Sequence, residues 1–529
     1  MAVGQRPFPK WLYVLALILF LGSVTAVFVH RRLTNIDEYT RDWVVRELSE
    51  RFDSQIALES MHVQILPAMT VRGRGLTVHY HNRSDVPPLI HVQDFTFNVG
   101  LIGIIRPVTR ISSVVLNDMV VTIPPRRNME KQNSPSQRTA RPVPHVEIDR
   151  IICNDTTIYF MSKNPGKDPL DFEIHNLLLT DVGAEKPFDF RGNLTNAKPK
   201  GEIETTGKFG PWDLDQPGNT PVSGNYEFTD ADLDPFSGIG GTLSSTGKYS
   251  GPLDHLAVDG ITETPNFSID PVGRGVPLYT DFSATVDGTD GDTFLHPVRA
   301  VLGESVITAN GGVVLQRAKH GHLIRLDVDA PAAQLKDILR LAMKSDTPPL
   351  TGTIKLHTKL VVPPSKAKTV DKLLLDGDFD ADDAEFTSVD IRTELASLSR
   401  HALGKPEDPK AGSAVTGLKG HFHLAKAVVT FTQLNFSVQG AKVLLAGTYK
   451  LHGGELDFHG HLQMKASLSE TMTGAKAALL KPLDPFFRRG NSGAVIPITI
   501  TGTRENPVFG VSIFHKTFKK EMGAQKEKR

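Results

Sequence analysis

From about residue 55 onward, apolar and polar side chains alternate with a period of two residues. The clearest stretch covers residues 456–468, where the apolar positions share one face and the polar positions share the other. This period is typical of a β-strand with one buried face and one solvated face. The apolar set of this stretch is Leu456, Phe458, Leu462, Met464, Ala466 and Leu468.

The same alternation recurs along the chain, and turn signals separate the alternating stretches. Gly453-Gly454 is a hairpin signal that joins residues 443–451 to residues 456–468. The pattern therefore predicts a mainly β protein built on an antiparallel sheet with a single apolar side. Further alternating stretches lie at 76–80, 324–328, 354–360, 373–382 and 496–513.

Few segments show the period of an amphipathic helix that could cover the apolar side. Residues 332–345 and 388–403 show it, and residues 475–480 form a short stretch that ends before Pro482. Because the predicted helices are short, the apolar face must close on itself as a sandwich, a curled sheet or a groove. We expect an elongated, curled antiparallel sheet.

The N-terminus predicts a membrane anchor. Residues 11–29 contain no charged side chain, and nineteen residues of helix span about 28 Å, enough to cross a hydrocarbon core. A cleaved signal peptide is the alternative, with Val24-Thr25-Ala26 as the cleavage site. Both interpretations place the remainder of the chain outside the cytoplasm. Residues 35–52 predict an amphipathic helix.

Composition divides the chain loosely and excludes some functions. Apolar residues make up 40% and charged residues 22% of the 529 residues, as in globular proteins. Lys plus Arg and Asp plus Glu number 59 each, which gives no basic excess for nucleic-acid binding.

We expect the chain to be divided into seven regions. They are a cytoplasmic N-terminus (1–10), the anchor (11–29), an N-terminal region (30–125), a mobile polar loop (126–144), a central β-rich region (145–370), a C-terminal β region (371–515) and a disordered basic tail (516–529).

The sequence offers little support for catalysis, a cofactor or a metal. The single cysteine, Cys153, lies in an apolar run that reads as a strand, so it is expected to be buried and inert. Nucleotide-binding, zinc-protease, serine-hydrolase and Cys-x-x-Cys motifs are missing. Asp378, Asp380 and Asp382 read as the solvent face of a strand. We therefore predict a protein that is not an enzyme, with no catalytic residues, no cofactor and no metal.

Four His-x-His pairs could each begin a metal site, because two residues apart on a strand point to the same side. A third ligand would have to come from a neighbouring strand, so we interpret the pairs as polar surface. They are His79/His81, His320/His322, His421/His423 and His459/His461.

The order of these features resembles the AsmA-like family of diderm bacteria, which includes TamB-like relatives. The resemblance lies in the patterns at about residues 10–125 and 375–515. Its carriers are RFDSQIALESMHVQILPAMTVRGRGLTV, GLKGHFHLAKAVVTFTQLNFSVQGAKVLLAGTYKLHGGELDFHGHLQMKASL and ITITGTRENPVFGVSI.

The resemblance implies a single-pass inner-membrane protein whose large domain lies in the periplasm. It implies a non-enzymatic role in envelope biogenesis, binding or conducting phospholipid toward the outer membrane, with other envelope proteins as further partners. A scaffold for outer-membrane components with a closed, lipid-free core is the main alternative, and an anchored periplasmic hydrolase is a weaker one. The expected groove residues are Leu445, Tyr449, Leu456, Phe458, Leu462, Met464, Ile496, Ile498 and Ile500.

Overall fold

The computed structural model divides the chain into two compact units, and each is described separately. The N-terminal unit comprises residues 1–195 and 205–222, and the C-terminal unit comprises residues 196–204 and 223–529. The structure describes residues 41–42, 44–46, 49, 54–64, 69–79, 87–99, 108–123, 145–161, 170–183, 186–197, 199–213, 216–234, 238–269, 274–288, 291–316, 321–343, 347–365, 367–407, 414–488, 493–513 and 516–521.

Strands dominate the described part of the N-terminal unit. They are β1 (Ile56–Ala57), β2 (Ser60–Gln64), β3 (Met69–Val78), β4 (Ile90–Val99), β5 (Val108–Ile123), β6 (His145–Phe160) and β7 (Leu170–Val182). The boundaries between the two units fall within three strands, β8 (Phe188–Ala197), β9 (Lys200–Phe209) and β10 (Pro221–Asp232). The short helix η2 (Pro217–Asn219) precedes β10.

One pairing in this unit departs from the antiparallel prediction. Strands β2 to β5 and β6 to β7 pair antiparallel, but β5 and β6 are parallel, with Val114 opposite Ile151. A parallel neighbour requires the chain to return along the whole strand before it starts again. Residues 124–144, which join β5 to β6 in the sequence, lie outside the described residues, and the alternating pattern did not reveal the parallel pairing.

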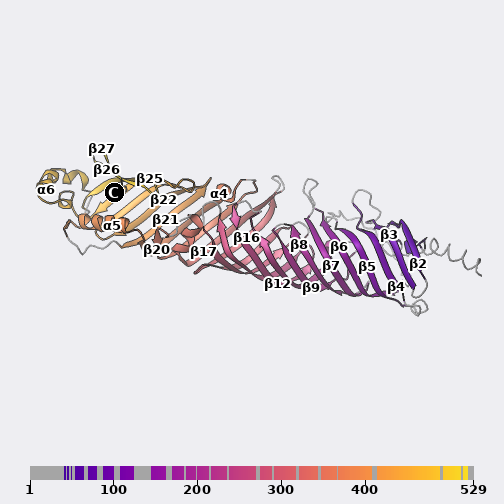
Figure 1. Cartoon of the computed structure of the whole chain (residues 1–529). Helices are drawn as coiled ribbons and strands as arrows, with labels where there is room; N and C mark the ends of the chain where they lie inside the picture. Colours follow the sequence, from indigo (N-terminus) through magenta and orange to yellow (C-terminus); the bar gives the residue numbers. More distant parts are fainter. Residues whose placement is uncertain are drawn as a thin grey trace, which may run out of the picture. The chain divides into compact units, whose positions relative to one another are not determined.

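The C-terminal unit is an antiparallel meander, in which successive strands follow one another along the sheet (Figure 1). The two-residue strands β11 and β18 are exceptions. The strand β11 pairs with β13 while β10 pairs directly with β12, and β18 pairs with β20 while β17 pairs directly with β19. The strands are β11 (Ile239–Gly240), β12 (Thr242–Pro252), β13 (Leu256–Ile269), β14 (Val276–Val286), β15 (Thr293–Leu302), β16 (Ser305–Gln316), β17 (Gly321–Gln334), β18 (Leu350–Thr351), β19 (Thr353–Val362), β20 (Leu374–Phe386), β21 (Val415–Ala425), β22 (Val428–Val438), β23 (Ala441–Lys450), β24 (Glu455–Met464), β25 (Val495–Thr503), β26 (Pro507–Ile513) and β27 (Lys516–Glu521).

Glycines opposite aromatic residues allow this sheet to curl. Gly420 lies opposite Phe379 and Gly447 lies opposite Phe458 in the strand register. A Cβ atom on Gly447 would lie 2.2 Å from the Asp457 carbonyl oxygen and 2.8 Å from the Phe458 ring. The rings occupy the space above the glycines, which lets neighbouring backbones bend toward the apolar side. A mainly β fold with a curled sheet and few short helices is therefore confirmed.

The described helices of this unit are α3 (Leu335–Ala342), α4 (Thr369–Lys372), α5 (Val389–Ala402), η3 (Ser469–Thr471), α6 (Ala475–Leu480), η4 (Lys481–Leu483) and α7 (Asp484–Phe487). Three of them, α3, α5 and α6, lie within the three predicted helical segments, whereas α4, η3, η4 and α7 were not predicted. The Ser388 side chain caps α5 by accepting a hydrogen bond from the Ile391 N–H.

Two boundaries differ from expectation. The strand predicted to reach Leu468 ends at Met464, because the Ala466 N–H bonds the Ala402 carbonyl of α5 and the chain leaves the sheet. The tail predicted to be disordered begins with β27, which pairs with β26.

Some N-terminal predictions fall outside the described residues, namely the anchor at 11–29 and the polar loop at 126–144. Within the predicted helix at 35–52, the described positions 41, 42, 44–46 and 49 are helical. Among the residues that the structure describes, no helix has the length and apolarity to cross a bilayer.

Candidate functional site

The strand register of the C-terminal unit builds one continuous apolar surface, which we call the inner face. Leu326 of β17 lies opposite Leu360 of β19, which lies opposite Leu375 of β20, and that residue lies opposite Leu424 of β21. The row continues to Val429 of β22. Because every second residue points to the same side, each row adds to one apolar strip across the strands.

All nine residues predicted for the groove lie in one hydrophobic cluster on this inner face. Five are buried, which places them in a packed core rather than on an open surface: Leu445, Phe458, Leu462, Met464 and Ile496. Four are half-buried and pack against that core: Tyr449, Leu456, Ile498 and Ile500.

The helix α3 covers part of the inner face. It contacts β13, β14 and β17, and the Arg340 carbonyl accepts a hydrogen bond of 2.9 Å from the Arg274 N–H. Its side chains Leu335, Ile338 and Leu339 belong to the same hydrophobic cluster as the inner face. Immediately after α3, Met343 lines a cavity of about 410 Å³ together with Tyr449 and other residues near the β23–β24 hairpin.

A small second cluster joins residues that are far apart in sequence. Ile269 is the last residue of β13 and Leu451 follows the last residue of β23, and both pack against the buried Val370 and Ala427. The helix α3 and this cluster therefore cover part of the inner face.

The strands from β12 to β17 carry half-buried inner-face residues beside buried ones such as Val276 and Ala284. Tyr249 lies opposite Val258, and Gly260 lies opposite Phe282, with Leu326 further along. Tyr249, Val258, Phe282 and Leu326 are all half-buried. This stretch of the inner face therefore offers apolar surface to a ligand more readily than the packed core around Leu462 does.

The opposite, outer face carries an ordered row of ionisable side chains. The row crosses four neighbouring strands, and each member lies opposite the next. Its members are Asp329 of β17, His357 of β19, Asp378 of β20 and His421 of β21. His421 Nδ1 lies 3.0 Å from the Asp378 carboxylate. Residues of this row line a hollow of about 670 Å³ on the polar side of the sheet.

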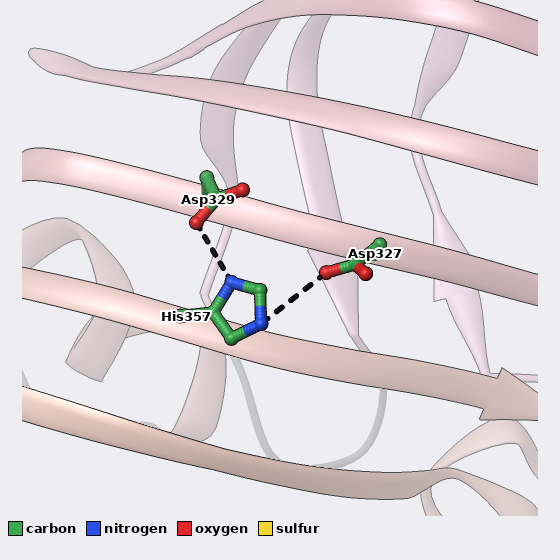
Figure 2. A group of neighbouring side chains, drawn as sticks. All are labelled: Asp327, Asp329 and His357. Atoms are coloured by element: carbon green, nitrogen blue, oxygen red, sulfur yellow. Dashed lines mark hydrogen bonds and ion pairs between the residues drawn. The ribbon is translucent and has the colours of Figure 1, made fainter.

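His357 lies between two carboxylates of β17 (Figure 2). Its Nδ1 is 2.7 Å from the Asp329 carboxylate, and its Nε2 is 3.5 Å from the Asp327 carboxylate. The hydrogen bond to Asp329 raises the pKa of His357, a slight loss of hydration opposes this, and the charges of Asp329 and Asp327 add to the increase. A carboxylate at each ring nitrogen favours the doubly protonated imidazolium.

Among the described residues, one group of side chains has ligand atoms close enough together to hold a metal ion. It consists of Asp327, Asp329 and His357. A metal ion binds a histidine through one ring nitrogen, whereas the two carboxylates here face different nitrogens. The arrangement therefore suits a proton better than a metal.

The His-x-His pairs have different surroundings. His421 and His423 both face aspartates of β20, since His423 Nδ1 lies 3.3 Å from the Asp376 carboxylate. His459 pairs with Asp457 of its own strand. His81 and His320 lie outside the described residues. The row through His357 was not identified from the sequence. The available signal was the Asp327-x-Asp329 pair on one alternating stretch and His357 on the next.

Cys153 matches its prediction. It lies in β6 with no exposed surface, and burial raises the pKa of Cys153 to about 12. A thiol with this pKa is neutral and inaccessible, so it is not a nucleophile.

The fold and site define the class: a mainly β protein with a long curled sheet, an apolar inner face and a polar outer face. Comparison with protein-family models, with curated proteins and with solved structures found no match.

Proposed function

We propose that this chain is a non-enzymatic, membrane-anchored lipid-handling protein of the cell envelope, whose inner face holds the acyl chains of phospholipids. The observation that carries the proposal is the apolar row that crosses β17, β19, β20 and β21, formed by Leu326, Leu360, Leu375 and Leu424. Transferring a two-chain lipid through water exposes some thirty methylene groups, at about 0.8 kcal/mol each. A continuous apolar strip removes most of that cost.

The proposal includes the anchor at residues 11–29 in the inner membrane and a periplasmic location for the rest. The sequence resemblance to the AsmA-like family supports both, and it supports transfer toward the outer membrane. The half-buried inner residues of β12–β17 are the binding surface that we favour, because the residues around Leu462 are already packed.

Site-specific photo-crosslinking tests this proposal without requiring a charged residue in the core. A photoreactive amino acid at Leu326 or Phe282 of the full chain is expected to crosslink to phospholipid during expression, as measured by mass spectrometry. The matched controls are the adjacent outer-face positions Arg325 and Asp281, which are exposed. Equal lipid adducts at inner and outer positions, or none at either, would refute lipid binding at the inner face.

The packed core favours a second candidate, a scaffold whose inner face is closed and empty. In that case the photoreactive group at Leu326 crosslinks only to neighbouring protein segments. Phospholipid is then missing from the chain purified with little detergent.

A further inference from the structure

The segment between β24 and β25 carries two of the most exposed large apolar side chains in the described chain. Leu479 is 77% exposed and Phe486 is 76% exposed. Both lie in the helical run formed by α6, η4 and α7. Figure 1 shows α6 beyond the ends of the neighbouring strands, which leaves this run accessible to a large partner.

The spacing of the run separates two apolar stripes. Leu480, Leu483 and Phe487 follow an i, i+3, i+7 spacing and pack against the hydrophobic core. Leu479, Pro482 and Phe486 repeat that spacing one position earlier and are exposed. The first stripe fixes the run to the sheet, and the second is presented to solvent.

Hydrogen bonds hold the run in place. The Asp484 carboxylate accepts bonds from the Ser469 N–H at 2.8 Å and from the Ser469 hydroxyl at 2.6 Å. Residues 472–488 contain one acidic residue, Asp484, and its carboxylate is already hydrogen-bonded to Ser469. Lys481 and Arg488 are exposed beside the apolar stripe. The surface therefore combines protruding apolar side chains with a basic border.

We infer that this tip, defined as Leu479, Pro482, Phe486, Lys481 and Arg488, docks on the surface of a bilayer that contains anionic lipids. Interfacial membrane binding requires apolar side chains that enter the boundary of the acyl chains and basic side chains that meet the headgroups. A tip with this composition meets both requirements. The inference is independent of lipid binding along the inner face.

The test uses the full chain held in an amphipathic polymer and an environment-sensitive dye on a cysteine. Leu479→Cys carries the dye at the tip, and Phe294→Cys, at a position 52% exposed on β15, is the matched control. The native Cys153 is fully buried and does not compete for the dye. Vesicles of phosphatidylglycerol and phosphatidylcholine are then added.

We expect iodide quenching of the dye at position 479 to fall severalfold on vesicle addition, while the dye at position 294 is unaffected. Lys481→Gln with Arg488→Gln is expected to weaken the apparent vesicle affinity on the order of tenfold. Lys248→Gln with Arg299→Gln, at exposed positions on other strands, is the control and leaves affinity unchanged.

Three outcomes would overturn the inference. The dye at position 479 could remain equally quenched with vesicles, or both dyes could be protected alike. Protection that grows with protein concentration in the absence of vesicles would instead identify a second copy of the chain as the occupant.

Discussion

At the scale of single residues, two side-chain choices on opposite faces of the sheet explain its shape and its charge. Glycines on the inner face admit aromatic rings from the neighbouring strand, as Gly447 does for Phe458. On the outer face, histidines and aspartates alternate from strand to strand, as Asp329 and His357 do. The glycines determine how the backbone bends, and the paired histidines and aspartates determine the protonation of the outer face.

Gly447→Ala should destabilise the C-terminal unit. The added methyl group would lie 2.2 Å from the Asp457 carbonyl oxygen, so the backbone or the Phe458 ring must shift, at a cost of about 1–3 kcal/mol. Denaturant unfolding followed by circular dichroism measures the loss. Gly275→Ala is the control, because its nearest neighbours lie at 3.4 Å and above. Equal stability of the two variants would contradict the close approach.

The protonation of His357 gives a second prediction at this scale. Its pKa in the folded chain should exceed 6.5, and Asp329→Asn should lower it more than Asp327→Asn, because the Asp329 hydrogen bond is the largest cause of the shift. Titration of the labelled imidazole by NMR measures all three values. A pKa for His357 that Asp329→Asn leaves unchanged would refute the assignment.

The sign of the linked stability follows from the direction of that shift. A raised pKa means that the folded chain holds the proton more tightly than the unfolded chain. The stabilisation is fully present below pH 6.5 and is lost as the pH rises through the pKa of folded His357. Its size is small because the ring is solvent-exposed.

At the scale of elements, α3 depends on one buried carboxylate. Asp337 is 2% exposed and accepts hydrogen bonds from the Glu304 N–H at 2.9 Å and the Ser305 hydroxyl at 2.8 Å. Ser305 in turn accepts a bond from the Gln334 N–H at the start of the helix. The turn between β15 and β16 is thereby joined to the helix that covers the inner face.

Asp337→Ala should therefore cost about 2–3 kcal/mol in the free energy of unfolding, because it leaves buried donors without partners. Lys336→Ala is the matched control on the same helix. It removes only the ion pair with Glu304, of the kind usually worth at most about 1 kcal/mol. Urea unfolding of the two variants compares them, and a control loss as large as that of Asp337→Ala would show that the buried network contributes little.

At the scale of the whole molecule, alternation along the sequence predicted the strands, because the side-chain period depends only on neighbouring residues. It also predicted that Leu462 and Ile496 share a face, and the register confirms this. It could not predict that β5 and β6 run parallel, since the period is the same in both directions. Nor could it show that α3 packs on strands β13, β14 and β17 or that Ile269 packs against Val370 and Ala427, because these contacts join residues far apart in sequence.

The inner face is packed around Leu462 and only half-buried at several positions of β12–β17, and this difference leads to a prediction for the whole chain. A phospholipid that binds only the folded state should stabilise it by RT ln(1 + [L]/Kd), about 2.7 kcal/mol when the free lipid reaches a hundred times Kd. Unfolding of the delipidated chain with increasing amounts of monomeric short-chain phosphatidylcholine measures the effect. We expect Leu326→Glu to reduce the shift and Arg325→Glu to preserve it, because the two side chains occupy opposite faces of β17. If the unfolding midpoint does not depend on lipid in the unsubstituted chain, the apolar surface is already satisfied by its own side chains, and the scaffold interpretation is the correct one.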